Sequence, residues 1–197
     1  IIIPSQWSSP QIVFKMKNLE CNPNPKYVEN ASCLIKAKNW NNAVAQMDCD
    51  LIIPLRNVTA SLNLLDTYFI IILYNNILQI QLEVFKKGYN NRFHPFLINT
   101  TVKMCEILSK RNYATYGTIM QKILKDFSNI NHSCPYTGHM YARNLFIDAN
   151  YSFIPKFPVG FYMMSFTITE NFSNMPSQHV GNIKYYMQAA EMVQIRK

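Results

Sequence analysis

Apolar and polar residues alternate along much of the chain, in runs separated by Pro, Asn and Gly. The first run places Ile12, Phe14 and Met16 on one face, as expected of a β-strand with one buried side. A second run follows the turn at 22–25 and supplies a further apolar face, which consists of Tyr27, Ala31, Cys33, Ile35 and Ala37. We expect these two runs to pair as antiparallel strands.

Further runs with one apolar and one polar face follow at Leu51–Leu62, Phe96–Cys105, Leu145–Phe153, Tyr162–Ile168 and Ile183–Ile195. About seven short strands separated by turns are typical of a β-sandwich. The pattern therefore predicts a mainly β fold of the sandwich type.

Residues 114–128 depart from this alternation. Their apolar residues recur at helical spacing, at Tyr116, Ile119, Met120, Ile123, Leu124 and Phe127. This spacing predicts one amphipathic helix near 114–128. Such a helix can lie on a membrane surface, but an apolar stripe usually packs against a core, and we expect it to cover a sheet edge.

The chain of 197 residues is 49% hydrophobic and only 15% charged, a composition typical of one folded domain. We expect that domain at 12–197, preceded by residues 1–11 as a signal-peptide remnant or an N-terminal tail. The longest apolar stretch, 68–73, is far shorter than the roughly 20 residues of a membrane-spanning helix. The sequence thus predicts no transmembrane segment.

Six N-x-Ser/Thr sequences offer acceptors for N-linked glycans, where roughly two would arise by chance at this content of Asn, Ser and Thr. The acceptors are Asn30, Asn57, Asn99, Asn131, Asn150 and Asn171. The excess predicts a secreted, extracellular glycoprotein. The five cysteines then indicate two disulfides and one unpaired cysteine, although their spacing leaves the pairing open.

The net charge of +8 comes from Lys and Arg scattered along the chain. No DNA- or RNA-binding signature accompanies them, so we predict no nucleic-acid partner. A basic protein would instead favour anionic head groups or an anionic membrane surface.

The motifs of common enzyme classes are absent: the chain has no glycine-rich phosphate loop, H-E-x-x-H, C-x-x-C or G-x-S-x-G. His132, Cys134 and His139 are zinc-ligand types, but a disulfide better explains Cys134 in an oxidising compartment. Cys49 lies between Asp48 and Asp50, whose charges should raise its pKa and weaken it as a nucleophile. We therefore predict a non-enzymatic protein with no metal and no other cofactor.

Three segments resemble a large family of secreted insect proteins related to the ML lipid-recognition domain. They are 129–138 (NINHSCPYTG), 95–105 (PFLINTTVKMC) and the N-terminal pattern of 17–21 (KNLEC), 27–28 and 33–36. The resemblance implies an immunoglobulin-like sandwich with a cavity between its sheets, as in the ganglioside-activator-like chemosensory proteins of insects.

The same resemblance implies disulfides that join Cys21 to Cys33 and Cys105 to Cys134. Cys49 departs from the family pattern and is left as a free thiol, either idle or available for an intermolecular disulfide that makes a dimer. The stretch at about 63–79 also departs from the pattern and resembles an insertion.

The function that the resemblance implies is non-enzymatic binding of an apolar ligand between the sheets, such as a lipid, a fatty acid or a long-chain hydrocarbon, in a role such as chemosensation. Met and aromatic residues on the expected inward faces are suited to an adaptable pocket. We nominate Phe14, Met16, Phe96, Ile98, Met104, Tyr162, Met164, Phe166 and Tyr185. A filled core would contain the same residues. The alternative is therefore a secreted interaction module that docks on a cell-surface receptor without a lipid.

Overall fold

The protein is mainly β, with few helices. The structure, a computed structural model, describes residues 12–38, 42–55, 61–63, 70–72, 77–107, 115–132, 134–146, 157–172 and 176–192. The strands are β1 (Ile12–Pro23), β2 (Val28–Ala37), β3 (Ala43–Leu55), β4 (Ser61–Asn63), β5 (Ile70–Ile72), β6 (Ile77–Lys87), β7 (Phe93–Lys103), β8 (Tyr136–Leu145), β9 (Gly160–Asn171) and β10 (Gln178–Glu191). The helices are α1 (Met104–Ile107) and α2 (Thr115–Phe127).

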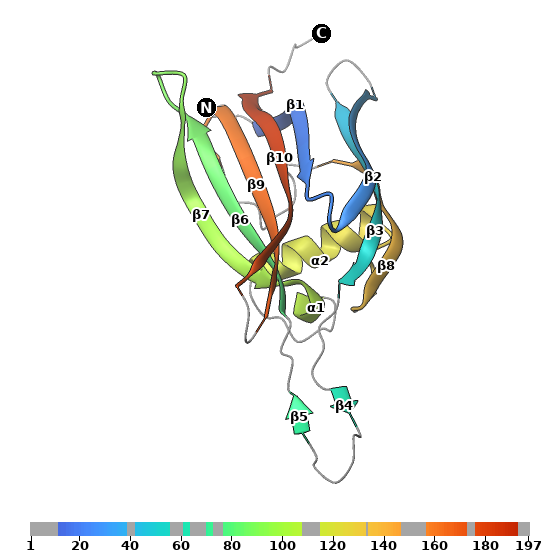
Figure 1. Cartoon of the computed structure of the whole chain (residues 1–197). Coiled ribbons are helices and arrows are strands. Elements are labelled where there is room, and N and C mark those ends of the chain that lie inside the picture. Colours follow the sequence, from blue (N-terminus) through green and yellow to red (C-terminus); the bar gives the residue numbers. More distant parts are fainter. Residues whose placement is uncertain are drawn as a thin grey trace, which may run out of the picture.

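Two principal sheets make up the architecture (Figure 1). The larger sheet has the strand order β1-β10-β9-β6-β7, the smaller sheet has the order β2-β3-β8, and all their pairings are antiparallel. Among the described strands, β4 and β5 pair only with each other. Side chains of both principal sheets share one apolar cluster, so the sheets face each other across a common interior.

The expected pairing of the first two runs is wrong. β1 pairs with β10, and β2 pairs with β3 in the other sheet. The turn at Asn24 sends the chain from one sheet to the other, because the Asn24 amide nitrogen donates to the carbonyl oxygen of Val180 at 2.9 Å and its side chain donates to that of His179 at 2.6 Å. β1 and β2 are instead joined by the disulfide between Cys21 and Cys33.

A β-bulge between Met16 and Asn18 adjusts the inward face of β1. Phe14 and Met16 are buried before it, and Leu19 is buried after it. Simple alternation would have turned Leu19 and Cys21 toward solvent. The extra residue therefore keeps the second half of the strand, including its cysteine, directed toward the smaller sheet.

The strand boundaries differ from the expectation in several places. β6 and β8 were not predicted, and Met104 and Cys105 form α1 rather than the end of a strand. Of the run 145–153 only its first two residues are described, and Leu145 ends β8. In the stretch 63–79, the described residues belong to β4, β5 and the start of β6, which pairs with both β7 and β9.

The predicted amphipathic helix is present as α2. Its Met120 is buried and its Leu124 is partly buried against the core, beside β8 and α1. The apolar stripe therefore packs against the protein interior. Within the described ranges, neither helix combines the length and hydrophobicity needed to cross a bilayer.

The core consists of two clusters. The first cluster draws on β1, β3, β6, β7, β9 and β10, together with Phe157 just before β9. The second cluster joins the opposite ends of the sheets to α1 and α2, through residues such as Ile80, Ile107 and Met120. Phe166 packs against both clusters. The apolar interior thus consists of two clusters at opposite ends of the sheets, and Phe166 lies where they meet.

The expected apolar face of β2 is largely exposed, which corrects the prediction for that strand. Ile35 is 37% exposed and Leu34 is 61% exposed, and only Val28 and Cys33 of β2 are partly covered. β2 is an edge strand of the smaller sheet. Its edge position leaves much of both its faces uncovered.

Candidate apolar ligand site

Eight of the nine nominated pocket residues gather at the first cluster. Six of them are buried members of it, namely Phe14, Met16, Ile98, Tyr162, Met164 and Tyr185. Phe96 and Phe166 are partly buried against the same cluster. Met104 is buried in the second cluster instead, because the chain turns into α1 at this residue. The strand alternation thus identified the inward faces of β1, β7, β9 and β10.

A row of three side chains crosses the larger sheet where the two clusters meet. Cys21 lies opposite Ile183, and Ile183 lies opposite Phe166, on β1, β10 and β9. We call these three residues the interior row. Cys21 is bonded to Cys33 of the smaller sheet, and Ile183 and Phe166 pack against the first cluster. All three are nevertheless only partly buried. Solvent therefore reaches side chains that belong to the interior.

The smaller sheet presents mostly small side chains to the first cluster. Ala45 is fully buried there, and Ala43 and Met47 are partly buried against the cluster. The larger sheet faces them with bulky Met and Tyr residues, such as Met187 and Tyr185. Because the thioether of Met is flexible, this side of the interior can adapt its shape.

Four aromatic rings meet at the end of the first cluster nearest the β6–β7 connection. Phe157 lies 5.8 Å from Phe14, 6.1 Å from Phe96 and 4.9 Å from Tyr162 between ring centroids. Phe96 and Tyr162 are 5.5 Å apart. Tyr162 is fully buried, and its hydroxyl donates to the carbonyl oxygen of Pro158 at 2.6 Å. We call Phe14, Phe96, Phe157 and Tyr162 the aromatic group.

Lys86 lies directly beside the aromatic group. Its ammonium is 5.5 Å from the ring centroid of Phe96 and 5.7 Å from that of Tyr162. On β6, Lys86 has the same parity as the buried Leu82 and Val84, which places it on the inward face. The expectation from sequence missed this lysine, as well as Phe157 and Met187. The parity of β6 was the signal that could have found Lys86.

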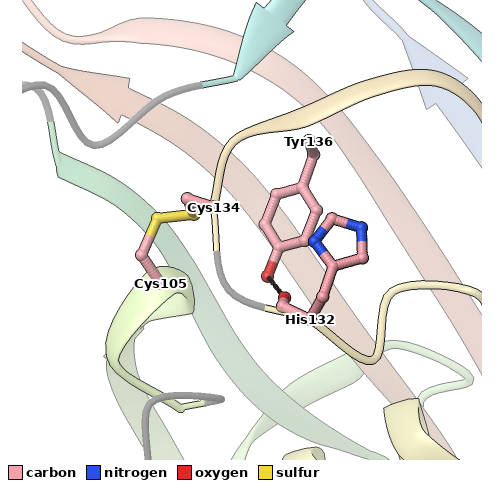
Figure 2. Close-up of a disulfide and its surroundings, with 4 residues drawn as sticks. All are labelled: Cys105, His132, Cys134 and Tyr136. Atoms are coloured by element: carbon pink, nitrogen blue, oxygen red, sulfur yellow. Dashed lines mark hydrogen bonds between the residues drawn. A yellow bond between two sulfur atoms is a disulfide. The ribbon is translucent and has the colours of Figure 1, made fainter.

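The disulfide between Cys105 and Cys134 ties α1 to the segment before β8 (Figure 2). Tyr136 follows it, and its hydroxyl donates to the carbonyl oxygen of His132 at 3.0 Å. Burial raises the pKa of Tyr136 to about 12. Cys105, Cys134 and Tyr136 all belong to or pack against the second cluster. Both disulfides are the pairs that the family resemblance implied.

Cys49 forms no disulfide. It is partly buried on β3, and burial raises its thiol pKa, with further contributions from the charges of Asp50 and Asp48. The direction agrees with the expectation from its acidic neighbours, but burial is the larger cause. A raised pKa lowers the thiolate fraction and hence the nucleophilicity of this cysteine.

The outer face of the smaller sheet carries a polar cluster. His139 Nδ1 lies 2.8 Å from Asp50 Oδ1, and Arg143 donates to Asp48 Oδ1 at 3.2 Å. The Asn30 amide donates to Asp50 Oδ2 at 2.9 Å. The hydrogen bond from Asn30, followed by that from His139, lowers the pKa of Asp50. These groups are largely exposed, so their contribution to stability is modest.

We expect Asp50→Asn to flatten the acid limb of the stability profile. A carboxylate with a lowered folded-state pKa contributes stability above its unfolded pKa of about 4, and that contribution is lost as the pH falls through the folded pKa. Urea denaturation at a series of acidic pH values measures the slope. Asp126→Asn, on the exposed face of α2, controls for net charge. Equal slopes for wild type and Asp50→Asn would contradict the prediction.

The predicted glycan acceptors differ in their surroundings. Asn30, Asn99 and Asn131 are exposed, and Asn171 is partly buried. Asn57 and Asn150 lie outside the described residues. Asn30 has a left-handed backbone conformation, with φ of 51°, at an irregularity between Glu29 and Ser32. Its neighbours from Glu29 to Ser32 are exposed as well, so the exposure of Asn30 does not depend on strand alternation.

The zinc-ligand types singled out in the sequence have other partners. Cys134 is bonded to Cys105, and His139 contacts Asp48 and Asp50. In the described part of the chain, no three or more His, Cys, Asp or Glu side chains are grouped so that they could hold a metal ion.

Together, the two facing sheets, the two disulfides and the apolar interior define a disulfide-linked, mainly β protein. Residues 80–164 match the model of a family described as "Protein of unknown function (DUF1091)". The matched part runs from β6 to the first half of β9 and contains Lys86, Phe96, Tyr162 and the disulfide between Cys105 and Cys134. A search of the curated proteins found no match.

Proposed function

We propose that the protein is a secreted, non-enzymatic carrier that holds an apolar ligand between its two sheets, in an ML-like immunoglobulin-like sandwich. The observation that carries the proposal is the partial burial of the interior row. In a filled sandwich core, side chains at the centre of the inward face would be closed off from solvent. In this proposal the ligand lies beside Phe166 and Ile183, the two partly buried side chains of the row that pack against the first cluster.

The chemistry of the surrounding residues favours an apolar occupant. The first cluster consists of aliphatic and aromatic side chains together with Met16, Met164 and Met187. Thioethers and flat rings can rearrange around alkyl chains of different shape. Burial of a chain of about 16 carbons would contribute on the order of 13 kcal/mol gross, before the cost of its lost freedom. Micromolar or tighter binding is consistent with these magnitudes.

The two disulfides and the exposed acceptors Asn30, Asn99 and Asn131 are compatible with secretion. They support an extracellular role for the carrier, and the basic charge of +8 would assist approach to anionic surfaces.

The test is to express the chain in a secretory eukaryotic host, purify it without detergent and extract it with organic solvent. We expect mass spectrometry to recover one class of lipid or hydrocarbon at close to one molecule per chain. Phe166→Asp should abolish this recovery, because a carboxylate in the interior row would be desolvated by an apolar ligand. Phe161→Asp is the matched control, since Phe161 lies on the same strand and is 45% exposed.

Circular dichroism and thermal unfolding establish that both variants are folded. Should Phe166→Asp fail to fold, the wild-type protein still decides the question. A protein that is empty after purification and remains empty when it is offered fatty acids, phospholipids and hydrocarbons would overturn the proposal.

A secreted interaction module is the second candidate. The exposed Leu34 and Ile35 of β2 favour it, because apolar side chains on an edge strand suit a protein partner. An empty protein that binds a cell surface, and loses this binding in Leu34→Lys, would support the module instead of the carrier.

A further inference from the structure

We propose that the ligand is a single-chain amphiphile with an anionic head group, and that Lys86 binds this head group at the end of the apolar interior. The inference rests on the proposed function, since it names the class of ligand that the interior would hold. It is carried by the position of one cation at the border of the first apolar cluster.

The register of the larger sheet defines this position. Met16 lies opposite Met187, Met187 lies opposite Tyr162, and Tyr162 lies opposite Lys86. These four residues form one line across β1, β10, β9 and β6. The first three are buried in the first cluster, and Lys86 is partly buried beside it. An ammonium thus stands at the border of the apolar surface that would contact a ligand chain.

The stem of Lys86 passes close to β9, and its ammonium lies beside two aromatic rings. A Cβ at Gly160 would come within 3.2 Å of Lys86 Cε, so the glycine allows the stem to pass close to β9. The rings of Phe96 and Tyr162 flank the ammonium. Among the described residues, no carboxylate forms an ion pair with Lys86. The rings have no lone pairs comparable to those of a carboxylate, so the three N–H donors of the ammonium suit an incoming anion.

Lys87 offers a matched comparison on the same strand. Its ammonium also lies over a ring, 5.9 Å from the centroid of Phe161. Its parity is opposite to that of the buried Val84, and Phe161 is an exposed residue. Lys87 therefore has the same charge and a similar ring contact, but on the outer face. A general effect of positive charge would be shared by both lysines, whereas head-group binding belongs to Lys86 alone.

The experiment compares two ligands that have the same 16-carbon chain and differ in the head group, hexadecanoate and 1-hexadecanol. Both are titrated at neutral pH against the neutral fluorescent probe N-phenyl-1-naphthylamine bound to the delipidated full chain. We expect wild type to prefer hexadecanoate by about tenfold, the value of a charge-assisted hydrogen bond. Lys86→Met should remove this preference and leave the affinities for hexadecanol and the probe unchanged. Lys86→Arg and Lys87→Met should retain it.

The outcomes separate the two proposals. Binding of the probe and of both ligands without a preference for the carboxylate, or a preference that survives in Lys86→Met, would overturn the role of Lys86 and leave the carrier intact. A protein that binds neither the probe nor either ligand would overturn the carrier and, with it, the head-group site.

Discussion

Tyr162→Ala is expected to lower the free energy of unfolding by about 4 kcal/mol, the usual cost of truncating a large buried aromatic side chain. Tyr162 has no exposed surface, and its ring contacts Phe96 and Phe157 within the aromatic group. Alanine would leave a cavity that residues on several strands border. Urea denaturation followed by circular dichroism measures the change.

Two control variants test the contribution of the hydroxyl group and the assignment of the buried face of β9. Tyr162→Phe removes only the hydrogen bond to the carbonyl of Pro158, and should cost about 1 kcal/mol. Phe161→Ala alters the neighbouring exposed side chain, and should cost well under half as much as Tyr162→Ala. Similar losses for Tyr162→Ala and Phe161→Ala would show that the inward face of β9 is misassigned.

Replacement of both Cys105 and Cys134 by Ser is expected to destabilise the protein by about 3 to 4 kcal/mol. The disulfide closes a loop between residues 29 apart in sequence, and the unfolded chain gains conformational freedom when this loop is opened. Both cysteines also belong to or pack against the second cluster. Urea denaturation under non-reducing conditions measures the loss.

The other disulfide supplies the comparison. Cys21 and Cys33 are only 12 residues apart, so their replacement by Ser should cost about 3 kcal/mol or slightly less. A larger loss of stability for this pair than for Cys105 and Cys134 would mean that the conformational entropy of the unfolded chain does not decide which disulfide stabilises the protein more. It would indicate that the link between β1 and β2 stabilises the contact between the sheets directly.

Local alternation predicted which faces of several strands are buried. In β9, Tyr162 and Met164 are buried while Phe161 is exposed, as period-two patterning requires. Helical spacing was equally informative for α2. These features depend on residues close together in sequence, and a single chain displays them directly.

The pairing of the strands was harder to predict, and so were strands in which apolar and polar residues do not alternate clearly. β1 pairs with β10, which lies at the other end of the chain, and no local pattern encodes that choice. β8 was missed because it is rich in exposed polar residues and lacks a continuous apolar face. β6 does alternate clearly, but its start was read as part of an insertion. No strand was predicted at 80–87, so Lys86 was not assigned to an inward face.

Burial of the candidate site was only partly predictable for the same reason. Phe157 belongs to no run of alternating apolar and polar residues. Its ring nevertheless contacts the three other rings of the aromatic group. Its role depends on strands that meet around it in space. Phe166 is likewise only partly buried although it lies on an inward face. How completely such a residue is covered depends on the packing of the sheets, which sequence patterning does not express.

The edge position of β2 has a consequence for how the protein behaves at high concentration. In the part of the chain that the structure describes, β2 pairs only with β3, so its other edge presents backbone donors and acceptors beside the exposed Leu34 and Ile35, which is the arrangement that templates addition of a strand from another molecule. Asn30 lies on this same strand. A glycan there would act as a steric guard against edge-to-edge aggregation, and chains made without glycans would have to rely on the twist and charges of the edge alone.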